Sequence, residues 1–243
     1  MNPDSPRPRI SLLGGFELEM QGPALVLPEG SQRLLAYLAL QGRLIRRQTV
    51  AGTLWPIANE ARASSSLRSA LSRLGNHARA AVESSAASLG ISQDASVDLW
   101  DAQVLAHRLL APDTTDPAAP GAEAIPALST ELLPDWYDDW ALVEAEDWRQ
   151  LRLHALEALA ERLTARGEYA DAAAAALAAV RAEPLRESPR AALIRVHIAE
   201  GNPSEALREF AKYGDLLMLE LGVEPTQRLR DLVTDLWSEA PTE

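Results

Sequence analysis

A repeat of 34 residues is the feature that most constrains the fold of this chain. The segment Gly167-Glu-Tyr-Ala-Asp-Ala172 lines up with Gly201-Asn-Pro-Ser-Glu-Ala206, so a glycine and an alanine recur at the same spacing. The preceding stretch, residues 142–166, is expected to be one long helix. A repeat of this length is typical of helix pairs that stack on neighbouring pairs.

The period is that of the tetratricopeptide repeat, in which two helices meet at a tight turn. We expect Gly167 and Gly201 at the turns, where a residue without Cβ is useful, and Ala172 and Ala206 where the helices approach. Chance agreement in an alanine-rich chain is the alternative. Surfaces of such repeats bind peptides and proteins and rarely catalyse. Residues 97–243 are therefore predicted to be an all-α interaction or oligomerisation domain.

Residues 9–96 predict a second, mixed domain, because short alternating stretches precede three segments with helical spacing. The expected elements are a strand pair in Arg9–Glu19, a strand at Leu25–Leu27, a helix capped by Ser31 and stopped by Gly42, a helix capped by Thr49, a helix capped by Asn59 with the stripe Leu67, Leu71, Leu74 and Ala78, and a hairpin of residues 81–83 and 89–91. This is the element order of a winged helix-turn-helix, whose third helix enters the major groove of DNA. The fold class is thus mainly α, with an α+β N-terminal domain.

The charge is distributed unevenly over the net value of −12. Residues 1–90 hold ten arginines and six acidic residues, whereas residues 91–243 hold 13 basic and 29 acidic residues. A mildly basic front and a strongly acidic back indicate that the front contacts phosphate and the back does not.

Candidate DNA-binding residues lie on the third predicted helix and before the second. Off the leucine stripe, Arg68 is placed to read guanine, and its serine neighbours are placed to bond to phosphates or base edges. Arginines before the second helix, and the amide at its start, are expected at phosphates. A solvated helix face is the alternative for any one of them. The full set is Arg43, Arg46, Arg47, Thr49, Arg62, Ser65, Arg68, Ser69, Ser72 and Arg73.

Residues spread over most of the chain match a known family. They are Ser31–Leu40, Leu54-Trp55, Ser72–Leu74, Val97–Leu99, Trp140, Leu151–Leu156, Glu183–Glu187 and Glu220–Pro225. On these residues the chain resembles the actinobacterial antibiotic regulatory proteins, which join an OmpR-type winged helix to a bacterial transcriptional activator domain. The resemblance implies an activator of secondary metabolism that binds double-stranded promoter DNA at repeats and helps recruit RNA polymerase. It leaves open whether the protein is a homodimer.

The expected wing departs from the family pattern, because residues 84–88 read SSAAS and carry no basic side chain. This departure keeps two alternatives open. In one, the winged helix has lost its DNA affinity and the repeats act through a partner regulator. In the other, the C-terminal surface takes a small ligand.

Several classes of chemistry are not expected. The chain has no cysteine, and its four histidines are scattered without ligand spacing, so no metal, cofactor or catalytic residue is predicted. The acidic cluster around Trp136 and Trp140 is interpreted as structural, with the aromatic rings packing the start of a helix. No apolar run reaches the length of a membrane span. We expect a cytoplasmic protein whose residues 1–8 form a disordered tail.

Overall fold

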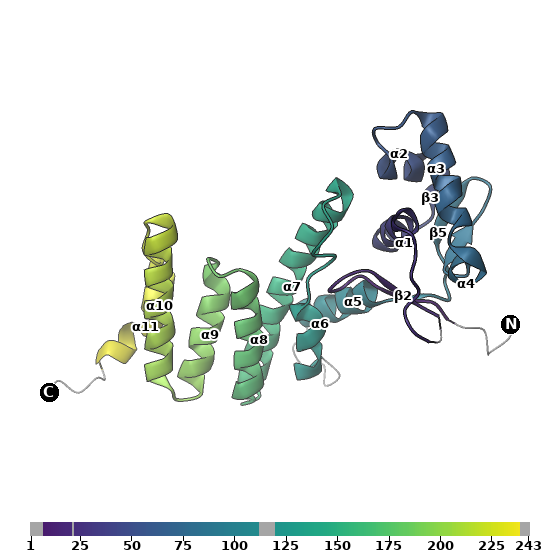
Figure 1. Ribbon diagram of the computed structural model, residues 1–243. Coiled ribbons are helices and arrows are strands. Elements are labelled where there is room, and N and C mark those ends of the chain that lie inside the picture. Colours follow the sequence, from purple (N-terminus) through teal and green to yellow (C-terminus); the bar gives the residue numbers. More distant parts are fainter. Residues whose placement is uncertain (1–6, 21, 112–119, 239–243) are drawn as a thin grey trace. The chain divides into compact units, whose positions relative to one another are not determined.

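The computed structural model describes residues 7–20, 22–111 and 120–238 (Figure 1). The described chain forms two compact units, and each is discontinuous in sequence. The first unit is built from the chain up to Asp101 together with Glu131–Trp148. The second is built from Ala102–Thr130 and the chain from Arg149 onward. The sequence predicts two domains that meet at residue 97. In the structure, each unit draws on two separate stretches of chain.

A three-stranded sheet opens the first unit. Strands β1 (Arg9–Ser11) and β2 (Glu17–Glu19) pair antiparallel, with Ile10 opposite Leu18, which confirms the predicted strand pair. Strand β6 (Ser96–Val97) pairs with β1 in parallel. Part of the predicted tail joins this sheet, because the amide of Ser96 donates to the carbonyl of Pro8 at 2.9 Å. Residues 1–6 of that tail lie outside the described residues.

The predicted strand at Leu25–Leu27 is wrong. These residues form irregular backbone, and the amide of Leu25 donates to the carbonyl of Leu18 at 2.8 Å. Pro23 and Pro28 flank the segment. Because proline has no amide hydrogen to donate, the two prolines limit how far a strand could extend on either side.

Four helices follow in the first unit, and two of them begin earlier than predicted. Helix α1 (Glu29–Gln41) begins after Pro28, so Ser31 is not its cap, although Gly42 ends it as predicted in the left-handed conformation. Helix α2 (Arg47–Leu54) follows strand β3 (Ile45–Arg46) directly, so Thr49 lies inside its first turn rather than at its cap. A fixed proline φ and a preceding strand set these starts without a side-chain cap.

The third predicted helix is interrupted near its end. Helix α3 (Glu60–Ser72) begins as predicted, since the Asn59 side chain accepts from the amide of Arg62 at 3.0 Å. Gly75 then adopts a φ of 66°, and a short helix α4 (Gly75–Arg79) follows. Leu74 and Ala78 of the predicted stripe are still buried. The apolar spacing therefore identified the buried residues but not the break between the two helices.

The predicted hairpin is confirmed and forms the wing. Strands β4 (Val82–Ser84) and β5 (Ser88–Ile91) pair antiparallel, with Glu83 opposite Gly90. Strand β3 joins on the other edge of β5, where Ile45 faces Leu89. Helices α1 to α3 and this sheet thus give a winged helix-turn-helix.

Residues 131–148 complete the first unit. The amide of Gly14 donates to the carbonyl of Glu131 at 2.7 Å, and Arg33 on α1 forms an ion pair with Asp138. A chain of aromatic contacts accompanies these bonds, and it confirms the structural interpretation of the tryptophans. Its ring pairs are Phe16–Trp136, Trp136–Trp140 and Tyr37–Trp140, with centroids 6.2, 5.9 and 5.3 Å apart.

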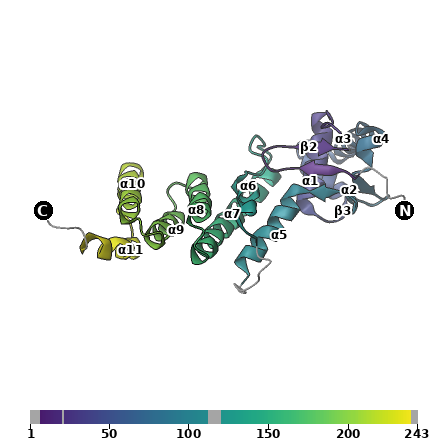
Figure 2. The ribbon, with the colours of Figure 1, turned by 90° about the horizontal axis from the view of Figure 1, so that it is seen from below.

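All regular elements in the described part of the second unit are helical. Its elements, some of which begin in the first unit, are α5 (Asp98–Leu110), the 3₁₀ turn η1 (Ala122–Ala124), α6 (Ile125–Ser129), α7 (Asp139–Ala165), α8 (Tyr169–Ala182), α9 (Glu187–Ala199), α10 (Pro203–Leu221) and α11 (Gln227–Ser238). Figure 2 shows α8 to α11 following one another in sequence order. Between α5 and α6, residues 112–119 lie outside the described part, and Ala122 starts the helical turn that leads into α6.

The repeat is confirmed in the second unit. Gly167 and Gly201 adopt φ values of 75° and 81° at the turns before α8 and α10. Ala172 and Ala206 are fully buried, as expected where two helices approach closely. The side chain of Tyr213 is buried at the α9–α10 packing and donates to the carbonyl of Leu185 at 3.0 Å. These contacts form the repeat core that the 34-residue period predicts.

Candidate nucleic-acid interface

Helix α3 presents a polar face to solvent and an apolar face to the core. Ala63, Leu67 and Leu71 are buried, in keeping with helical spacing. The opposite face consists of exposed residues of the predicted set, namely Arg62, Ser65, Arg68, Ser69 and Ser72. Arg73 is also exposed, and it caps the C-terminal end of the helix. The structure therefore brings all six predicted residues of α3 to one open side.

The position of α3 is fixed by a bond from α1. The hydroxyl of Ser31, which is fully buried, donates to the carbonyl of Ala70 at 2.9 Å. The Asn59 cap holds the other end of the helix. Because both ends are held by side-chain hydrogen bonds, the exposed face of α3 has a defined direction.

The residues predicted before the second helix do not all lie free. Arg43, Arg46 and Thr49 are exposed around the start of α2. Arg47 instead supports the wing, since its Nε donates to the carbonyl of Ser85 at 2.9 Å and a terminal nitrogen donates to the hydroxyl of Ser84 at 2.8 Å. The guanidinium of Arg47 therefore places positive charge beside the turn of the wing.

A second arginine reaches the same serine. Arg79 donates to the hydroxyl of Ser84 at 3.4 Å and to the carbonyl of Leu71 at 3.3 Å. Sequence reasoning missed Arg79, although a basic residue just before the predicted hairpin was an available signal. Two guanidinium groups thus flank a wing whose own turn carries no charge.

The turn of the wing is held by its own serines. The hydroxyl of Ser85 accepts from the amides of Ala87 and Ser88, at 3.2 and 2.9 Å. The amide of Ser85 donates to the carbonyl of Ser88 at 3.0 Å. Serine side chains that bond to nearby amides stabilise tight turns. The sequence SSAAS therefore forms a turn that its serines hold in place and that carries no basic side chain.

The arginines of the two units differ in their partners. Among the residues that the structure describes, five arginines of the predicted set form neither an ion pair nor a hydrogen bond through the side chain: Arg43, Arg46, Arg62, Arg68 and Arg73. In the second unit, by contrast, six arginines have a carboxylate partner: Arg149, Arg186, Arg190, Arg195, Arg208 and Arg230. Unpaired guanidinium groups attract phosphate without first breaking an internal bond. Five such arginines therefore lie on and beside α2 and α3.

Other kinds of site find no support in the described part of the chain. No group of three or more His, Asp or Glu side chains there could hold a metal ion. Of the helices in the described ranges, none has both the length and the apolar character required to cross a membrane.

Comparisons with known proteins agree with this arrangement. Residues 68–236 match the model of the bacterial transcriptional activator domain. The fold is similar to that of EmbR from Mycobacterium tuberculosis, solved in complex with a low-affinity phosphopeptide. The TM-score is 0.72 at 21% sequence identity, and the match covers 98% of this chain and 67% of that chain. No curated protein matches the sequence.

Proposed function

We propose that this chain, a transcriptional regulator that belongs to the bacterial transcriptional activator domain family, acts by binding double-stranded promoter DNA through α3. The observation that carries the proposal is the set of unpaired, exposed arginines on and beside this helix. A helix held at both ends that exposes arginine and serine is suited to the major groove. The antibiotic regulatory proteins resembled by the sequence join the same two kinds of domain.

The exposed residues divide by the part of DNA that each type recognises. Arg68, at the middle of the exposed face, is assigned to guanine, whose O6 and N7 accept both donors of a guanidinium. Arg43, Arg46 and Arg62 are also exposed and are assigned to phosphates. The amide of Thr49, in the first turn of α2, is assigned to a phosphate as well.

The second unit is proposed to act on proteins. This unit, residues 102–130 and 149–243, holds 13 basic and 19 acidic residues and so has a net charge of −6. Paired helices of this kind present surfaces that bind proteins. We therefore assign the recruitment of RNA polymerase to this unit and the recognition of promoter repeats to the first.

A different function is supported by the uncharged turn of the wing. In this alternative the winged helix no longer holds DNA, and the repeats act on a partner regulator or a small ligand. The two functions differ in their response to salt. Protein binding releases counterions from DNA, and this release is less favourable at higher salt, so DNA binding weakens steeply as salt is added. A purely protein-directed module shows no such dependence on promoter fragments.

The deciding experiment maps the sites that the full chain occupies across the genome and then footprints one of them. We expect enrichment at promoters that contain direct repeats, protection of both repeats, and affinity that falls with added salt. Purified RNA polymerase should then initiate more often at that promoter when the chain is present. An absence of enriched sites, with no salt-dependent binding in vitro, would reject the proposal.

A further inference from the structure

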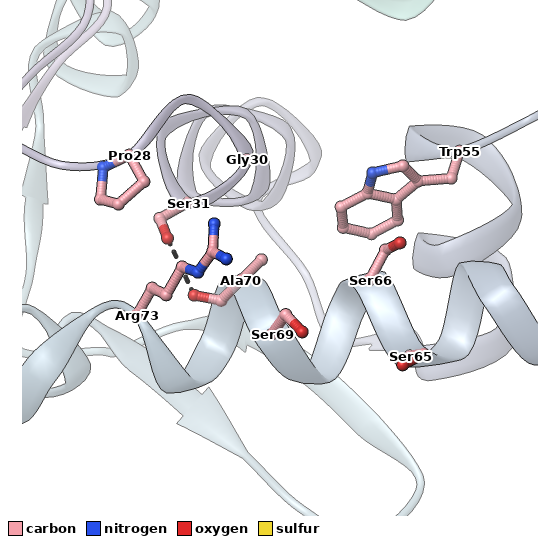
Figure 3. Close-up of a pocket in the computed structure, with 9 residues that line it drawn as sticks. All are labelled: Pro28, Gly30, Ser31, Trp55, Ser65, Ser66, Ser69, Ala70 and Arg73. Atoms are coloured by element: carbon pink, nitrogen blue, oxygen red, sulfur yellow. Dashed lines mark hydrogen bonds between the residues drawn. The ribbon is translucent and has the colours of Figure 1, made fainter.

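A polar pocket of about 310 Å³ lies beside the exposed face of α3 (Figure 3). Helix α3 forms one side, the start of α1 at Gly30 another, and Trp55 stands after α2 at the far end. In Figure 3 the side chain of Arg73 rises from α3 toward α1, and the ring of Trp55 lies above Ser66. The pocket therefore has a cationic end and an aromatic end.

The lining of this pocket carries a positive charge and hydroxyl groups but no negative charge. No residue that lines it, and all of them are described, carries a carboxylate. Arg73 and the serines Ser65, Ser66 and Ser69 have no side-chain partner among the described residues. A free guanidinium beside free hydroxyl donors suits an oxyanion.

We infer that this pocket binds a phosphodiester of the DNA backbone while α3 occupies the major groove. The inference rests on the proposed function and refines it. Ser65 and Ser69 line the pocket and also lie on the exposed face of α3, so the pocket opens onto the surface that would face DNA. A phosphate held between α1 and α3 positions the duplex and reads no sequence.

This site changes the assignment of residues within α3. Arg73, Ser66 and Ser69 hold the backbone, whereas Arg68, which does not line the pocket, remains to read a base. Helix α1, through Gly30, becomes a second element that borders the DNA. Neither Gly30 nor Ser66 belongs to the residues that the sequence singled out.

Gly30 offers a charge test with a matched control. A Cβ built at Gly30 meets no atom within 4 Å, so a side chain can start there without a clash. Glutamate and glutamine are both good helix formers and have nearly the same size. Gly30→Glu adds a carboxylate at the pocket, and Gly30→Gln gives the effect of size alone. We expect Gly30→Glu to bind promoter DNA at least about tenfold more weakly than Gly30→Gln at low salt, because one phosphate contact is replaced by repulsion.

Arg73→Ala tests the same phosphate by the salt dependence of binding. The slope of log affinity against log salt should become shallower by about 0.9, the value for one phosphate contact. The loss should be equal on promoter and unrelated DNA. Arg181→Ala, which removes an exposed arginine of α8, is the charge-matched control. Circular dichroism melts of all four variants check that each is folded.

The outcomes separate the two proposals. If the wild-type chain shows no salt-dependent DNA binding, the proposed function fails. If it binds, but Gly30→Glu equals Gly30→Gln or Arg73→Ala keeps the wild-type slope, the pocket assignment alone is overturned. Inorganic phosphate gives a further arm at constant ionic strength. Suppose that phosphate raises the wild-type melting temperature, that Gly30→Glu abolishes this rise, and that Arg73→Ala keeps the wild-type salt slope. The pocket is then a free-phosphate site, and the DNA assignment is rejected.

Discussion

Ser31 and Ala70 are joined by a buried hydrogen bond of 2.9 Å, although 39 residues separate them in sequence. The hydroxyl of Ser31 at the start of α1 donates to a carbonyl near the C-terminal end of α3. That carbonyl lies where α3 is about to end, so it depends on a side chain for its partner. The bond therefore connects the core helix to the helix that is proposed to read DNA.

Replacing Ser31 should weaken the first unit. Ser31→Ala leaves the carbonyl of Ala70 buried without this partner, and we expect the free energy of unfolding to fall by about 1 to 3 kcal/mol. Urea titration followed by circular dichroism measures the change. Ser65→Ala, an exposed serine of α3, should change it by less than about 0.5 kcal/mol. Equal stability of Ser31→Ala and the wild type would show that the bond contributes nothing.

Arg68→Ala should affect DNA recognition and leave folding unchanged. Arg68 is exposed and has no ion-pair partner among the described residues, so its removal disturbs no internal contact. Specific binding should weaken by about 1 to 3 kcal/mol, and discrimination at one base pair should relax. Gel-shift titrations on the footprinted site and on single-base variants test this. Unchanged affinity and specificity would remove Arg68 from the reading face.

Glu144→Gln should alter how stability depends on pH. Burial raises the pKa of Glu144 above its usual range, and the neighbouring carboxylate of Asp147 raises it further. The protonated form of Glu144 contributes to the free energy of unfolding. This contribution is fully present below the usual pKa and is lost as the pH rises through the raised pKa of the folded state. Glutamine stays neutral, so the stability of the variant relative to wild type should increase from about pH 4 to about pH 7.

Denaturant titrations of both proteins at the two pH values measure this difference. Asp135→Asn is the control, because Asp135 is an exposed carboxylate of the same segment. A relative stability of Glu144→Gln that stays constant or falls with rising pH would contradict the assigned direction.

Ala206→Leu should disrupt the repeat core. Ala206 is fully buried and belongs to the cluster that includes Ile194 and Tyr213, so three extra carbons have no room. Overpacking of this kind lowers the free energy of unfolding by about 1 to 3 kcal/mol. Ala211→Leu, at an exposed position of the same helix, should be nearly neutral. A thermal melt that does not distinguish the two variants would show that the helix pair adjusts to the larger side chain.

The sequence predicted the repeat well because its signal is local. Gly167 and Gly201 stand at turns that require positive φ, and Ala172 and Ala206 stand where only a small side chain fits. Each of these requirements acts on a single residue type at a fixed spacing. The winged helix-turn-helix was predicted for a similar reason, since Asn59 caps its helix through a bond to a residue three positions away.

Long-range contacts could not be predicted in the same way. Serine is a residue type that often caps helices, but the hydroxyl of Ser31 donates to a carbonyl of α3 instead. Arg47 looked like a free phosphate ligand, but serines of the wing, nearly 40 residues later, accept its hydrogen bonds. In both cases the residue type was recognised correctly as a donor. Its partner depends on the packing of distant segments, and no pattern of spacing in the sequence reports that packing.

The return of residues 131–148 to the first unit determines how the chain can be divided for experiments. A fragment that stops at residue 96 retains Phe16 and Tyr37 but loses Trp136 and Trp140, the rings that pack against them. Apolar surface uncovered in this way favours aggregation. Low solubility of such a fragment would therefore reflect the loss of residues 131–148 and not a failure of the winged helix to fold. A fair trial of DNA binding needs a chain that continues through residue 148.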